Sequence, residues 1–306
     1  MPGPTAHRSD RPSRRLCRSM NPPNRRAARV RAALLGILLA LPATALAHGA
    51  IDEQIEFVTE QIEKDPTSAA LFLKRAELHR VLRDWNAALA DYDRSSKLAP
   101  GLSDVDFCRG RMLLEAGRAE EAKASLDRLL RNEPDHAEAL ITRARVLVSL
   151  GEPASAVRDF NRGIAQLHAP DPQVYLEGAQ AAASQGPEHV DEALAALDRG
   201  IETLGPLASL ELPAIDLELA ARRYEAALAR LARLAEQSRR KETWLTRRGE
   251  ILQRAGRREP AREAFAEALA AIESLPPARR RTSATVALEQ RLRVLLEAPI
   301  TADEIR

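Results

Sequence analysis

The sequence is poor in aromatic residues and in the motifs that carry chemistry. Only 3% of its 306 residues are Phe, Trp or Tyr. It has no glycine-rich phosphate loop, nucleophile elbow, His-Glu-x-x-His helix or paired-cysteine metal motif. We therefore expect no enzymatic activity and no cofactor.

The composition that remains favours helices. Hydrophobic residues make up 45% of the chain and charged residues 29%, enough for a substantial core and unlike a disordered chain. Alanine, leucine and arginine are abundant, whereas β-branched residues are sparse. Because alanine, leucine and arginine lose little freedom in a helix, the sequence predicts an all-α fold.

The N-terminal segment has the layout of a secretory signal peptide. Arginines in residues 25–31 precede an apolar run at residues 32–41, which is followed by Pro42 and the small-residue site 45–47. A membrane anchor is the competing interpretation, but the run is shorter than the roughly 20 residues that span a bilayer. We expect residues 1–47 to be cleaved, with Met20 as a possible true start.

Export changes the charge and the cysteine count. Without residues 1–47 the chain keeps 37 Lys and Arg against 43 Asp and Glu, so it is acidic. This balance argues against a nucleic-acid partner, which requires clustered cations. Cys17 is lost, so Cys108 remains alone and forms no internal disulfide. We expect a periplasmic or secreted protein with no membrane span after cleavage.

A repeat of 34 residues runs through the remaining chain. Pro66, Pro100 and Pro134 recur at this interval, and each follows a helix-like stretch. Two further series of mostly small residues keep the same interval except for one shared step of 37, which fits a loop at residues 186–189. The two series are Ala88, Ala122, Ala156, Ala193, Ala227 and Ala261, and Ala76, Gly110, Ala144, Gly178, Ile215 and Gly249.

Residues 71–79, residues 84–92 and Pro100 together resemble one unit of the tetratricopeptide repeat, and the resemblance extends over roughly residues 50–275. It implies a right-handed superhelical α-solenoid of about six helix-turn-helix repeats with a capping helix at each end. We assign residues 48–67 to an N-terminal half-repeat, 68–275 to the repeats, and 276–306 to a C-terminal capping helix and tail. The fifth repeat departs from the pattern. Ile215 replaces a small residue there, and Pro213 is expected to interrupt the first helix.

The resemblance implies a scaffold that binds a protein or peptide along the first helices of its repeats. Two registers of those helices suggest an apolar stripe beside arginines, suited to a segment with apolar anchors and a carboxylate. The registers are Leu73, Phe107 and Ile141, and Glu77, Arg111 and Arg145. The chaperone-tail clamp of some family members is not matched, because Leu73, Glu77, Cys108, Glu138 and Thr142 stand where it uses lysine and asparagine.

A metal-binding role is the alternative hypothesis. Cleavage after Ala47 makes His48 the first residue, and its α-amino nitrogen and imidazole suit Cu(II). A second protein ligand is not evident, so the favoured hypothesis is a non-catalytic exported scaffold. The identity of its partner is not encoded in any of these patterns.

Overall fold

A computed structural model of the chain describes residues 43–238 and 240–297. It divides into two compact units, residues 1–57 and 58–306, which we describe separately. Most of the predicted signal peptide and the C-terminal tail lie outside the described residues, so their assignment stays a prediction.

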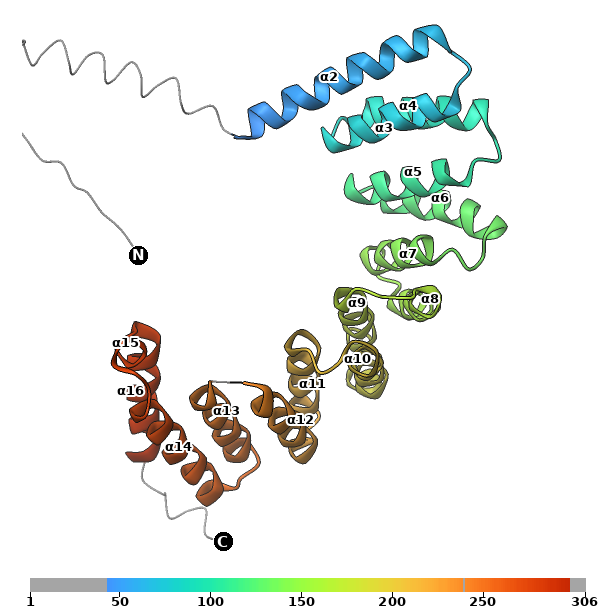
Figure 1. The fold of residues 1–306 in the computed structure, drawn as a ribbon. Helices are drawn as coiled ribbons and strands as arrows, with labels where there is room; N and C mark the ends of the chain where they lie inside the picture. The colour runs from blue at the N-terminus through green and yellow to red at the C-terminus, as the bar shows by residue number, and fades with distance from the viewer. Residues whose placement is uncertain (1–42, 239, 298–306) are drawn as a thin grey trace, which may run out of the picture. The chain divides into compact units, whose positions relative to one another are not determined.

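The second unit is built from helical hairpins, and its described residues contain no strand. In each hairpin a first helix packs on the helix that follows it, and consecutive hairpins contact each other (Figure 1). The six pairs are α3 (Ala69–Val81) with α4 (Trp85–Leu98), α5 (Ser103–Glu115) with α6 (Ala119–Asn132), α7 (Ala137–Ser149) with α8 (Pro153–Gln166), α9 (Pro172–Ala183) with α10 (Val190–Leu204), α11 (Ala208–Ala220) with α12 (Tyr224–Gln237), and α13 (Lys241–Arg254) with α14 (Arg258–Glu273). The predicted all-α array of six repeats is confirmed.

The turn inside five of the hairpins uses one residue in the left-handed backbone region. Glycine occupies this position in three of them, at Gly117, Gly151 and Gly256, with φ of 73°, 75° and 76°. Arginine occupies it in the other two, at Arg83 and Arg222, with φ of 60° and 59°. In the α9–α10 hairpin the connection is longer and contains the 3₁₀ helix η1 (Pro187–His189), where the sequence predicts the extra residues.

Small residues allow the paired helices to approach closely. A Cβ atom added to Gly110 would lie 2.7 Å from Cγ of Leu126, and one added to Gly249 would lie 2.3 Å from Cε1 of Phe265. Such distances are too short for carbon atoms in contact. Ala122 is fully buried in the same kind of crossing.

The fifth repeat is more regular than its sequence suggests. α11 runs without a break from Ala208 to Ala220 and includes Pro213. The expectation that Pro213 interrupts this helix is therefore wrong. Proline removes only one helical hydrogen bond, and the neighbouring Leu210 and Ile215 are completely buried, which holds the helix in place.

Further helices flank the hairpins. In the second unit, the last residues of α2 (Ala43–Lys64) bury Val58 and Ile62 in a cluster with Phe72. After α14 come the short α15 (Pro277–Arg280) and α16 (Ser283–Glu297), and Leu292 of α16 is buried in the cluster that contains Phe265. α2 begins before His48, so in the uncleaved chain His48 lies inside a helix.

Candidate partner-binding surface

A cavity of about 700 Å³ lies between α12, α13 and the beginning of α14. Its volume is within the range that ordinary ligand and peptide pockets occupy. The apolar part of the lining comes from all three helices: Leu228, Leu231, Ala232, Ala235, Trp244, Leu245, Leu252 and Pro260. The charged part consists of Glu225, Glu236, Lys241, Arg248 and Arg257.

The spacing of apolar residues along α12 explains why this helix forms one wall of the cavity. Leu228, Ala232 and Ala235 follow each other at intervals of four and three residues, so they share one face of the helix. Ala232 is exposed although it is flanked by apolar neighbours. Two ion pairs border this space, one from Arg257 to Glu225 at 2.6 Å and one from Arg248 to Glu267 at 3.6 Å.

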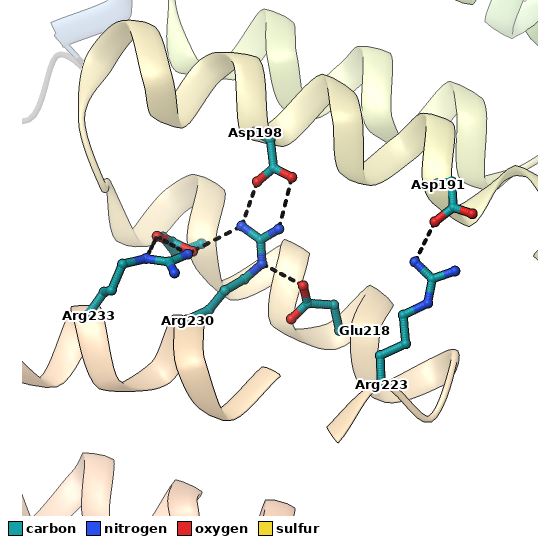
Figure 2. A network of polar contacts seen from close by, with 7 residues as sticks. Asp191, Asp198, Glu218, Arg223, Arg230 and Arg233 are labelled. Carbon is teal, nitrogen blue, oxygen red and sulfur yellow. Dashed lines mark hydrogen bonds and ion pairs between the residues drawn. The ribbon is translucent and has the colours of Figure 1, made fainter. Parts of the chain in front are cut away.

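The remaining faces of α12 are fixed by a buried polar network (Figure 2). Arg230 donates two hydrogen bonds to Asp198 of α10, at 2.6 and 3.0 Å, and one to Glu218 of α11, at 2.7 Å. Glu211 of α11 is completely buried and receives further hydrogen bonds from Arg230 and Arg233. The network therefore joins α12 to both helices that precede it.

The electrostatics of this network favour the charged form of the arginine. Burial by itself lowers the pKa of Arg230, but its hydrogen bonds to Asp198 and Glu218 and their negative charges raise the pKa above its ordinary value. Oε2 of Glu218 is buried without a hydrogen-bond partner. Arg230, together with Arg233 at Glu211, thus compensates several carboxylates and holds α12 in position.

The predicted binding residues on the first helices differ in how far they are exposed. Phe107 is half-buried, stacks on His136 with ring centres 5.4 Å apart, and lies beneath the guanidinium of Arg111. Leu73 is also half-buried, whereas Ile141 is only 5% exposed and belongs to the core. Ile141 therefore contributes no open surface to the predicted stripe.

Both predicted arginines already have acidic partners within the chain. Arg111 lies 2.5 Å from Oε2 of Glu77, and Arg145 lies 2.8 Å from Oε2 of Glu177. Glu77 also accepts hydrogen bonds from Tyr92 and Arg80. A partner's carboxylate would have to displace these groups, as it would at Arg248 and Arg257 of the cavity.

Sequence reasoning did not identify the cavity or the network. The spacing of apolar residues on α12 was one available signal, and the position of Trp244, one of only two tryptophans, was another. The network could not be found in this way, because its carboxylates come from two other helices at irregular separations.

The comparison with protein families agrees with this architecture. Residues 113–183 match the tetratricopeptide repeat family model. The chain contains tetratricopeptide repeats. The matched residues include the α7–α8 hairpin and all of the neighbouring helices α6 and α9.

Known proteins with tetratricopeptide repeats are similar to the chain over different lengths. A tetratricopeptide repeat and J domain-containing co-chaperone of Cryptococcus neoformans var. grubii is 29% identical over 120 residues, which are 39% of this chain and 22% of that protein. The C-terminal part of a repeat-containing protein of Cytophaga hutchinsonii aligns with a TM-score of 0.58 at 14% identity, over 78% of this chain and 94% of that one. A protein of Parabacteroides merdae aligns with a TM-score of 0.48 at 19% identity, over 82% and 93%. The alignment with the Cytophaga hutchinsonii protein supports the fold alone and leaves the partner open.

The described residues offer neither a cluster of metal ligands nor a membrane-spanning helix. No group of three or more His, Cys, Asp or Glu among residues 43–238 and 240–297 is arranged to hold a metal ion. Copper binding by His48 stays an untested prediction. Within the same residues, no helix combines the length and the apolar character that crossing a membrane requires.

Proposed function

We propose that this tetratricopeptide repeat protein is an exported, non-catalytic scaffold that binds a protein or peptide segment in the cavity between α12, α13 and α14. The observation that carries the proposal is the cavity itself. It combines an apolar lining with a charged border, the combination that holds peptide segments with apolar anchors.

The cavity suits this role better than the surface around Arg111 and Arg145. Arginines at both surfaces already have acidic partners, but Ile141 of the predicted stripe is buried in the core, whereas the cavity has an apolar lining from three helices. Trp244 is half-buried and contributes an aromatic side chain to the lining of the cavity. Aromatic residues of this kind concentrate the binding energy of interfaces.

A pair of substitutions on α12 tests the proposal. Ala232→Trp should fill the cavity, whereas Ala229→Trp adds the same side chain at an exposed position of the same helix that does not line it. The full-length chain and both variants would be used to capture proteins from the native source, with circular dichroism to check the folds. We expect one or more proteins to be captured by the wild type and by Ala229→Trp but not by Ala232→Trp.

The same two variants also show which result would contradict the proposal. If Ala232→Trp captures the same proteins in the same amounts as Ala229→Trp, the cavity is not the binding site. Export is checked separately by the intact mass of the purified protein, which should correspond to a chain that begins at His48.

A further inference from the structure

Helix α2 is acidic and has one open aromatic side chain. Residues 50–64 of α2 contain five Asp and Glu and one Lys. Phe57 on this helix is 57% exposed, although a side chain of this kind is usually buried. Glu53 and Glu60, four residues before and three residues after it, lie on the same helical face. The result is an aromatic side chain flanked by carboxylates.

Charge is distributed unevenly between the two parts of the repeat array. Residues 58–237 contain 22 Lys and Arg and 30 Asp and Glu, whereas residues 238–297 contain 14 Lys and Arg and only 8 Asp and Glu. The lining of the cavity itself has three basic residues and two acidic ones. An acidic ligand is therefore attracted to this end of the array and repelled from the other.

We propose that α2 of one copy of this protein docks into the α12–α14 cavity of a second copy, with Phe57 as its anchor. The phenyl ring occupies the space beside Trp244 and Ala232, and Glu53 and Glu60 lie near Lys241 and Arg248 at its border. The inference rests on the proposed function, because it names the occupant of the same cavity.

This contact is head-to-tail. Each copy contributes an α2 helix on one side and a cavity on the other, so the two surfaces of the contact are different. A heterologous contact of this kind leaves one free α2 and one free cavity in every dimer, and it therefore permits further addition unless a ring closes. The assembly should grow with protein concentration and weaken as salt screens its charges.

Sedimentation velocity of the full-length protein tests this arrangement over two decades of protein concentration. We expect the wild type and Ala229→Trp to form species larger than a monomer whose share falls when salt is raised. Phe57→Ser and Ala232→Trp should each sediment as monomers. Mixed in equal amounts, these two variants should form a dimer and nothing larger, because one supplies an intact cavity and the other an intact α2.

The remaining outcomes separate this inference from the proposed function. If the wild type is monomeric throughout, or if the mixture of the two variants stays monomeric, docking of α2 is wrong. If this happens while Ala232→Trp still loses a captured protein, the cavity binds a different partner. If Ala232→Trp alters neither capture nor sedimentation, both proposals are wrong.

Discussion

Arg230 of α12 and Asp198 of α10 face each other across a boundary between hairpins and form two parallel hydrogen bonds of 2.6 and 3.0 Å. The same guanidinium serves two buried glutamates of α11. Only 8% of Arg230 is exposed, so water cannot replace its bonds to those carboxylates.

Removing the guanidinium of Arg230 should therefore destabilise the folded protein. Arg230→Ala leaves Glu218 buried and unpaired and leaves Glu211 with Arg233 alone, and we expect it to lower the free energy of unfolding by about 3–5 kcal/mol. Arg223, the N-cap residue of α12, is the control, because it also forms an ion pair with α10, through Asp191, but both side chains of this pair are exposed. Urea unfolding should show little change for Arg223→Ala. Equal effects of the two substitutions would contradict the importance of the buried network.

Two helical glycines should respond in opposite ways to the same substitution. A Cβ at Gly249 meets Phe265 at 2.3 Å, whereas a Cβ at Gly178 has its first neighbour, Phe160, at 3.5 Å. Gly249→Ala should therefore destabilise the protein by about 1–3 kcal/mol through overpacking. Gly178→Ala should stabilise it by about 0.5–1 kcal/mol, because alanine is the better helix former. Thermal unfolding of both variants measures the two signs, and a gain for Gly249→Ala would show that this crossing has spare room.

Glu77 makes stability depend on acidity. Burial alone would raise the pKa of Glu77, but the hydrogen bond from Tyr92 and the charges of Arg111 and Arg80 outweigh burial and lower this pKa below 4.5. Its contribution is thus complete above about pH 4.5 and is lost as the pH falls through the lowered pKa of the folded state. The wild type should lose more unfolding free energy than Glu77→Gln when urea unfolding is compared at neutral and at acidic pH. Parallel losses would contradict this role.

The thiol of Cys108 should be unreactive. Burial and the nearby charge of Glu77 raise its pKa to about 12, so the nucleophilic thiolate is scarce at neutral pH. In a chain with Cys17→Ser, a disulfide reagent at mildly alkaline pH should modify Cys108 at least about tenfold more slowly than a free cysteine. The rate in the unfolded protein is the control. Rapid modification of the folded protein would argue for an accessible thiol.

The repeat pattern was the part of the structure that the sequence could predict. The spacing of prolines and small residues depends on local turns and on contacts between neighbouring helices, and it located the hairpins and the insertion near Pro187. The predicted break at Pro213 was wrong because the effect of one proline depends on the burial of Leu210 and Ile215 around it. Ile141 shares the register of Phe107 in the repeat, but it is packed in the core. The register alone does not reveal this difference in packing. The cavity depends on how three helices meet, and this packing leaves no regular period in the sequence.

The tie between Arg230 and Asp198 has a mechanical consequence. In a linear array, contacts join mainly adjacent hairpins, so a chain pulled from its ends tends to open one hairpin at a time. Here the α11–α12 hairpin cannot separate from α10 without breaking the two hydrogen bonds between Arg230 and Asp198. Under load, the fourth and fifth hairpins should give way together as a single long step, whereas the others yield in shorter ones.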